Sequence, residues 1–379
     1  MKEILKKGGL SFLLLCVALV MNHRFGYITI ISLLCGWVCV RSFWFKTRMD
    51  GVGWLLLLYC VLYVTQSAIN GFDYSPPILV LWIVAPPIFY YYGKHLTDLC
   101  STQREFMSLW FVILLCYMLD VAVIGLSEMR LTGSFFAERR MLSFYDQQIV
   151  SATQVALPLN VAMVGLPLAL LIRDKGLKVL YGLLTVCALL VVVYLLNRTG
   201  IVILMLCLAG AILLKVRDNR RFAFVAAGVI LAGSLLLLSC DLSDWEVVKL
   251  YQARNEQEGL EARSDRWSEH INYLLTHPFG WAEGGEVYYI HNMWLDIARI
   301  SGLLPFVMLC CLTIRFFARA MRNAWRSATE TNYLVLGLNV CFFASCFVEP
   351  IFGGTHFMLY CLLWGCQSSL AGSPQWNRF

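Results

Sequence analysis

The sequence is poor in charged residues: Asp, Glu, Lys and Arg make up 14% of the 379 residues, whereas 59% are hydrophobic. A soluble domain is closer to one quarter charged, so the composition argues against one. The sequence also lacks CxxC and HExxH, the spacings typical of metal sites. Most of its 15 cysteines lie inside apolar runs, where they behave as small hydrophobic residues. These absences indicate a polytopic membrane protein without a disulfide framework or a metal.

Apolar runs long enough to cross a hydrocarbon core of about 30 Å recur along the chain. They predict an all-α bundle, a single integral-membrane domain over residues 1–379 with about twelve transmembrane helices. The basic, then apolar N-terminus imitates a signal peptide, but no small-x-small cleavage site follows, so we expect a retained first helix. The expected spans are 8–21, 25–40, 51–69, 76–92, 106–126, 151–172, 177–196, 199–214, 222–239, 291–314, 331–348 and 354–370.

Lys and Arg residues in short loops set the orientation of a membrane protein. With the N-terminus inside, most of the 30 Lys and Arg residues fall in inside segments, and the bias alternates at nearly every loop. We therefore expect both termini in the cytoplasm, and the net charge of +6 reflects topology rather than nucleic-acid binding. Two long loops then face the periplasm: a smaller one at 127–150 and a large, partly helical one at 241–290.

Three arginines are candidate anion ligands on the outer side. Arg198 stands in "LLNRTG" between two apolar runs, where a charge is expensive in lipid. One interpretation is that the Arg198 side chain extends from a helix end to the membrane interface. The other is that Arg198 binds an anion at the start of the next helix, where free backbone N–H groups also favour phosphate. Arg263 and Arg266, in "EARSDRWSEH", share a face if that segment is helical. By themselves they indicate a solvated face; beside Arg198 they form a candidate clamp for a diphosphate.

The stretch "YYIHNMWLDIARISG", residues 288–302, opens an apolar helix on a histidine. His291 is either an interfacial side chain satisfied locally or a general base, because its pKa lies closest to neutral. Asn292 is suited to be the N-cap of the helix that follows. Asp296 and Arg299, one turn apart, are expected to form a simple intrahelical pair.

Four further residues have weaker signals. Asp120 lies within an apolar run and should face the bundle interior. Trp294 is expected in an aromatic belt at the outer surface. Glu349 and His356 flank "PIFGG" at an expected outer turn, without the spacing of a metal site.

Taken in order, "NRTG", "RSDRW", "HPFG" and "HN" followed by Gly302 resemble the O-antigen polymerase and O-antigen ligase family of bacterial integral-membrane glycosyltransferases. The resemblance covers about residues 195–302; elsewhere only the helix count agrees. Asn197 stands where the family often has Ser or Thr, and the large loop is on the short side. These departures concern the subfamily more than the chemistry.

The resemblance implies roles for these residues. Arg198 and Arg263 would hold the diphosphate of an undecaprenyl-linked oligosaccharide, with Arg266 as the neighbour that can take the role of Arg263. His291 would activate a hydroxyl of the acceptor glycan, without a metal or other cofactor, in an inverting transfer. The supporting residues would be Asn292, Arg299 and His356. The resemblance also implies the inner membrane, a site facing the periplasm, and a chain-length regulator protein as a partner.

Polymerisation of lipid-linked repeat units is the leading hypothesis. An O-antigen ligase, which transfers the glycan to lipid A core, is the alternative within the same chemistry, because both use the same donor. A membrane transporter or lipid-linked glycan flippase is the alternative from another class. Transporters often show matching halves, whereas the large loop here has no counterpart in the first half of the chain.

Overall fold

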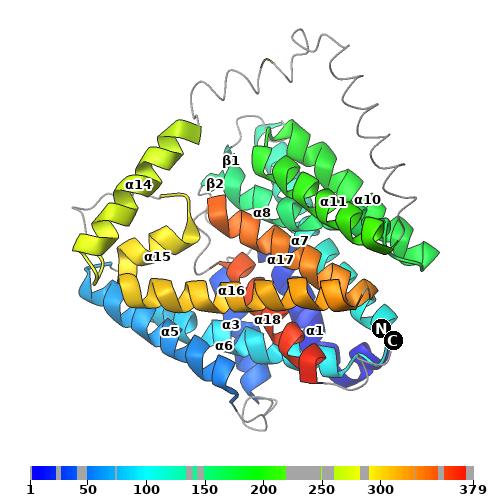
Figure 1. The fold of residues 1–379 in the computed structure, drawn as a ribbon, viewed down its shortest axis with the longest axis horizontal. Coiled ribbons are helices and arrows are strands. Elements are labelled where there is room, and N and C mark those ends of the chain that lie inside the picture. Colours follow the sequence, from blue (N-terminus) through cyan, green and yellow to red (C-terminus); the bar gives the residue numbers. More distant parts are fainter. Residues whose placement is uncertain are drawn as a thin grey trace.

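The computed structural model describes residues 2–22, 27–40, 49–72, 75–133, 140–142, 149–218, 249, 260–281, 290–327, 329–348 and 354–372. Nearly all of them are helical (Figure 1). The described helices that start before residue 200 are α1 (Lys2–Val20), α3 (Tyr27–Val40), α5 (Gly51–Ile69), α6 (Pro76–Asp98), α7 (Gln103–Thr132), α8 (Ala152–Ala162), α9 (Gly165–Ala169), α10 (Lys175–Tyr194) and α11 (Arg198–Asp218). The later helices are α14 (Leu260–Thr276), α15 (Met293–Ser301), α16 (Leu303–Arg326), α17 (Glu330–Val348) and α18 (Thr355–Gly372).

The membrane character of the chain is confirmed. Among the described residues, seven helices are long and apolar enough to cross a membrane: α5, α6, α7, α10, α11, α16 and α17. Asp120 on α7 is fully buried, as its position in an apolar run predicts. The large loop is partly helical, since α14 occupies residues 260–276. The expected span 222–239 lies outside the described residues.

Three expected boundaries are wrong. The span 151–172 is divided into α8 and α9 by a turn at residues 163–164, and the span 291–314 is divided into α15 and α16 at Gly302. The loop expected at 127–150 begins later, because α7 continues to Thr132. Part of this loop is a short antiparallel pair, in which β1 (Arg140–Leu142) pairs with β2 (Ile149–Ser151).

The centre of the bundle is the contact between α6 and α18, whose backbones approach closely through glycines. A Cβ atom on Gly365 would lie 1.8 Å from the carbonyl oxygen of Tyr90, and one on Gly93 would lie 2.0 Å from that of Leu362. Small residues allow such close approach between membrane helices, where packing rather than the hydrophobic effect drives association. The two helices therefore form a rigid core against which the others pack.

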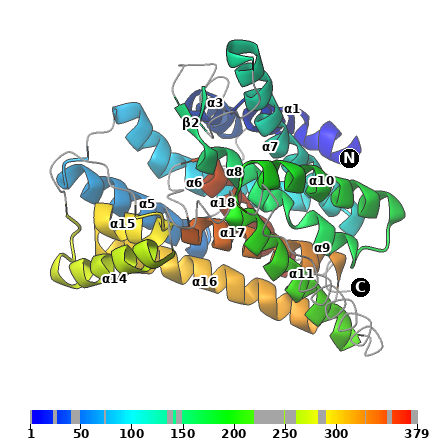
Figure 2. The same cartoon turned by 90° about the horizontal axis from the view of Figure 1, so that it is seen from above.

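The two ends of the molecule differ in charge. Figures 1 and 2 place α14 and α15 at one end and the start of α1 toward the other. At this second end, which we call the basic end, Arg104 pairs with Asp174 at 3.0 Å and Arg217 donates to the carbonyl of Trp325. The contacts join the ends of α7, α10, α11 and α16, so the basic helix termini meet on one side.

Candidate active site

His291 occupies a constrained turn before α15. Its φ of 57° lies in the left-handed region, which few residues other than glycine adopt. On one side of it, the N–H of Ile290 donates to Oδ1 of Asp296 at 2.9 Å. On the other side, Oδ1 of Asn292 accepts from the N–H groups of Trp294 and Leu295 at 3.1 and 3.2 Å. The predicted N-cap is thus confirmed, and both neighbours of His291, Ile290 and Asn292, are hydrogen-bonded to α15.

The helix that carries Arg266 packs against this turn. Nε1 of Trp267 on α14 donates to the carbonyl of Ile290 at 3.2 Å, and its ring lies 5.1 Å from that of Phe347. Arg266, next to Trp267, is half-buried. Arg263 lies on the same helix, and its side chain is outside the described residues. The structure therefore brings the arginine-bearing helix to the residue before His291.

The turn "HPFG", residues 277–280, closes over the junction between α15 and α16. The carbonyl of Pro278 accepts from the N–H of Leu303 at 2.8 Å, and the N–H of Trp281 donates to the carbonyl of Arg299 at 3.0 Å. Gly302 has a φ of 83°, and a Cβ atom there would lie 2.4 Å from the carbonyl oxygen of Pro278. The junction therefore accepts only glycine at this position without rearrangement.

Two amide side chains of α5 complete this closure, which we call the junction clasp (Gln66, Asn70, residues 277–281 and residues 299–303). Nδ2 of Asn70 donates to the carbonyls of Phe279 and Ile300, both at 2.8 Å. Nε2 of Gln66 donates to the same carbonyl of Phe279 at 2.9 Å. Sequence reasoning missed both residues, because nothing in "TQSAIN" distinguishes them from the polar end of a helix.

Asp296 and Arg299 are both buried, with 3% of each residue exposed. They do not form the expected intrahelical ion pair. Oδ2 of Asp296 and the Nε and Nη2 atoms of Arg299 are buried and have no hydrogen-bond partner among the described residues. The guanidinium lies 5.6 Å from the ring centroid of Phe72. Burial raises the pKa of Asp296 to about 6, although the N–H of Ile290 and the charge of Arg299 oppose the rise. Arg299 is therefore a buried cation with unused donors.

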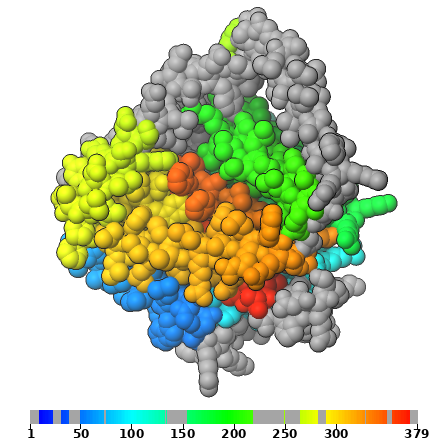
Figure 3. Space-filling view, in the orientation of Figure 1, coloured from blue at the N-terminus to red at the C-terminus, as the bar shows by residue number. Residues whose placement is uncertain are grey.

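An apolar groove of about 310 Å³ begins beside His291 and lies between α14, α16 and α17. Figure 3 shows α14 in yellow-green beside α16 in orange on this face. Trp294 is buried against the groove and donates to Oγ1 of Thr313 at 3.4 Å, so it is not in a surface belt as expected. The lining residues are Trp267, Ile271, Asn292, Trp294, Leu295, Phe306, Cys310, Thr313, Ile314, Phe343 and Phe347.

Arg198 starts α11, as the helix-terminus interpretation requires, and is half-buried. Before it, Nδ2 of Asn197 donates to Oδ1 of Asn160 at 2.9 Å. Helix α11 contacts α17, which in turn contacts α15. Helix α17 therefore lies between the helix of Arg198 and that of His291. The described contacts bring α14, the helix of Arg266, to the His291 turn, and Arg299 lies on α15, which follows that turn. Arg198 lies on α11, on the other side of α17.

His356 lies in the packed core in the first turn of α18. Its Nδ1 is 3.2 Å from the hydroxyl of Tyr117, and its ring centroid is 4.7 Å from that of Phe342. It is 1% exposed. These contacts favour a structural role for His356. Glu349, its expected neighbour, is outside the described residues.

Comparison with models of protein families and with curated proteins gives no match for this chain. Within the described part of the chain, no group of three or more His, Cys, Asp or Glu side chains is placed to hold a metal ion. The groups available for chemistry at this end are therefore the His291 turn, the arginine-bearing helix α14, the buried Arg299 and the apolar groove.

Proposed function

We propose that this protein joins lipid-linked oligosaccharide repeat units into a surface polysaccharide such as O-antigen. It would transfer a glycan from undecaprenyl diphosphate to a hydroxyl of an acceptor sugar. One observation carries the proposal: the His291 turn is fixed between a helix that bears arginine and an apolar groove. A glycan donor on a lipid diphosphate needs a base, cations and an apolar surface within one site.

The reaction is a single displacement at the anomeric carbon of the donor. His291 takes the proton of the acceptor hydroxyl, and the acceptor oxygen forms a bond to the anomeric carbon. The bond from that carbon to the diphosphate oxygen breaks, and the diphosphate leaves with the bonding electrons. Attack from the face opposite the leaving group inverts the anomeric carbon.

Arginines offset the charge that grows on the leaving diphosphate. Arg263 and Arg266 lie on α14, which contacts the His291 turn through Trp267, and Arg299 offers buried donors on α15. Guanidinium groups bind phosphate oxygens in a fixed, bidentate geometry, and they act most strongly where water is excluded. The family resemblance assigns Arg198 to the same diphosphate. Arg198 would contact this diphosphate only when the substrate is bound. The isoprenoid tail would lie in the apolar groove.

The proposal places this site at the periplasmic face of the bacterial inner membrane. The charge distribution supports this placement, because α14 and α15 lie away from the basic end. A transporter or flippase is less well supported: its binding site would be near the bilayer midplane, whereas the polar groups around His291 lie at one end of the bundle. Partners would be the lipid-linked oligosaccharide, the acceptor glycan and a chain-length regulator protein.

His291→Gln tests the proposal, because glutamine keeps a polar side chain but cannot take the proton. Cells that depend on this protein should lose long surface polysaccharide on a gel while inserting the variant normally. The matched control is Glu269→Gln, an exposed residue on α14 at the same end and outside the junction clasp, which should retain long chains. Long chains of normal length in His291→Gln would remove His291 from the reaction.

The species that accumulates distinguishes polymerase from ligase. Loss of a polymerase leaves single repeat units on the lipid A core, whereas loss of a ligase leaves lipid-linked polymer. Single repeats in His291→Gln cells would support polymerisation, and lipid-linked polymer would establish the ligase reaction instead. Unpolymerised repeats that remain on the cytoplasmic face would indicate a flippase.

A further inference from the structure

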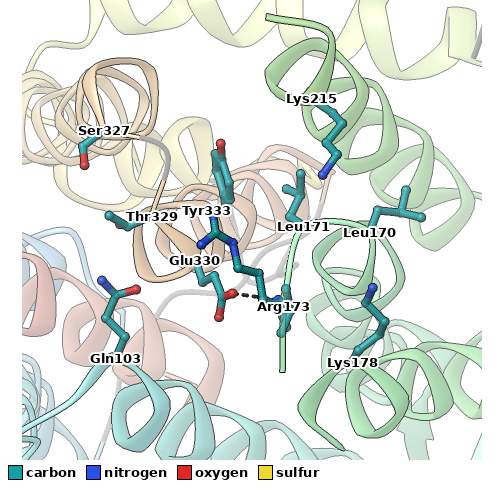
Figure 4. A pocket seen from close by; sticks show the side chains of 11 residues that line it. Gln103, Leu170, Leu171, Arg173, Lys178, Lys215, Ser327, Thr329, Glu330 and Tyr333 are labelled. Atoms are coloured by element: carbon teal, nitrogen blue, oxygen red, sulfur yellow. Dashed lines mark hydrogen bonds between the residues drawn. The ribbon is translucent and has the colours of Figure 1, made fainter. Parts of the chain in front are cut away.

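The basic end contains a cavity whose charge the proposed reaction does not use. It has a volume of about 570 Å³ and lies between α9, α10, α11 and α17. Figure 4 shows Arg173, Lys178 and Lys215 reaching it from different elements, with Glu330 among them. Oε1 of Glu330 accepts from the backbone N–H of Arg173 at 2.7 Å. None of the three cations forms an ion pair with another described residue. One carboxylate therefore faces three cationic groups.

A second cavity extends this positive charge. It has a volume of about 630 Å³ and shares Gln103, Ser327 and Thr329 with the first. Its cations are spaced three or four apart along α16 and share one face: Arg315, Arg319, Arg322 and Arg326. No acidic residue lines it. The two cavities together are a strong site for a negative group of phosphate type.

An apolar groove continues from the first cavity along the helices. The groove lies between α9, α11 and α17, and it shares Leu171 and Tyr333 with the cationic cavity. One wall, Leu206, is half exposed on the outer surface of the bundle, and Gly210 leaves the groove open because a Cβ atom there would meet nothing within 4 Å. The groove is small, with a volume of about 50 Å³, so it would hold only part of an acyl chain. A cationic cavity that leads into such a groove matches a lipid, with its phosphate in the cavity and the start of an acyl chain between the helices.

We propose that these cavities bind the phosphate headgroup of an anionic phospholipid, with the start of one acyl chain in the groove beside Gly210. Basic pockets between membrane helices at the leaflet surface attract such headgroups, and each added Lys or Arg strengthens the attraction. The site lies at the opposite end from His291 and does not depend on the proposed reaction. Bound lipid would join α10, α11 and α17 at the basic end.

Native mass spectrometry of the full chain in detergent tests the site, titrated with phosphatidylglycerol and with phosphatidylcholine. Phosphatidylglycerol should bind preferentially. The double variant Lys178→Gln/Lys215→Gln should weaken its binding by about thirtyfold, because two cations of the cavity are lost. Lys175→Gln is the matched control: it removes a charge from the first turn of α10 that does not line the cavity, and binding should be unchanged. Equal loss in the control, or equal binding of phosphatidylcholine, overturns the site.

A groove variant and a soluble competitor identify the source of the phosphate. Gly210→Leu fills the apolar groove and should weaken phosphatidylglycerol binding without changing any cation. Inorganic phosphate at the same concentration should displace little of the lipid, because it lacks the chain. If inorganic phosphate displaces the lipid and Gly210→Leu has no effect, the cavity is a site for a free anion and the lipid assignment is wrong. Unchanged melting temperatures confirm that each variant is folded.

Discussion

The backbone N–H of Trp281 donates to the carbonyl of Arg299, whose guanidinium is buried near Phe72. This bond joins the end of the "HPFG" turn to the last turn of α15. Because α15 also fixes both neighbours of His291, the "HPFG" turn and the candidate base belong to one hydrogen-bonded unit. We therefore expect a change in the junction clasp to alter the position of His291.

Gly302→Ala should destabilise the junction clasp more than an ordinary substitution at positive φ. Gly302 has a φ of 83° and a ψ of −173°, a conformation that is essentially restricted to glycine and costs another residue about 1–3 kcal/mol. The added Cβ would also meet the carbonyl oxygen of Pro278 at 2.4 Å. Gly71→Ala is the matched control, with a φ of 78° and nothing within 4 Å of the new Cβ. The melting temperature in detergent should fall clearly further for Gly302→Ala. Equal falls would mean that the clasp rearranges freely.

Asn70→Asp should loosen the junction clasp from the side of α5. The change keeps the shape of the side chain but replaces the amide donor with an acceptor. The carbonyl of Ile300 then loses the donor from Asn70, and the carbonyl of Phe279 keeps only Gln66. Leaving such groups unpaired costs about 1–3 kcal/mol. Limited proteolysis should cut the variant faster near residues 277–281. Asn272→Asp, on the exposed face of α14, is the control and should leave the cleavage rate unchanged.

The local parts of the site could be predicted, and the tertiary parts could not. The N-cap at Asn292 and the helix at 260–276 follow from hydrogen bonds and periodicity within a few residues. The break at Gly302 does not, because the apolar run continues through it and its cause is the carbonyl of Pro278. Asn70 lies 230 residues from Ile300 in the chain, so no local pattern could join them.

Tertiary contacts also explain why the expected ion pair of Asp296 and Arg299 and two of the expected spans differ from the structure. Spacing alone predicted that Asp296 and Arg299 would pair, but the N–H of Ile290 takes one oxygen of the carboxylate and the guanidinium lies near Phe72. Hydropathy finds where apolar helices exist and does not find where tertiary contacts divide them, as between α8 and α9. That α14 packs against the His291 turn became clear only from the contact of Trp267 with the carbonyl of Ile290.

Arg299→Gln should lower turnover without lowering stability. If Arg299 binds the leaving diphosphate, its loss should reduce kcat by about a hundredfold, as for other preorganised charge-stabilising donors. Removing a buried cation whose Nε and Nη2 lack partners should leave the melting temperature unchanged or raised. Purified protein with a lipid-diphosphate oligosaccharide measures kcat and KM separately. Arg104→Gln, at an exposed site on α7, is the control. A lower melting temperature with normal kcat would assign Arg299 a purely structural role.

Asp296 should make stability depend on pH between about 4 and 6. Its pKa in the folded state, about 6, lies above the ordinary value of 3.8 because burial disfavours the carboxylate. The folded state therefore binds this proton more tightly than the unfolded state, and the stability this adds is complete below pH 4 and lost as pH rises through 6. The shift corresponds to about 3 kcal/mol. Asp296 lies on α15, which is too short to span a membrane.

Asp296→Asn isolates this effect, since an amide oxygen can still accept from the N–H of Ile290 but cannot ionise. The melting temperature of the unchanged protein should fall relative to that of the variant as pH rises from 4 to 7.5. Asp265→Asn, an exposed carboxylate on α14, should follow the unchanged protein at every pH. Parallel curves for Asp296→Asn and the unchanged protein would show that Asp296 stays ionised in the fold, and Arg299 would then have a charged neighbour throughout the working range.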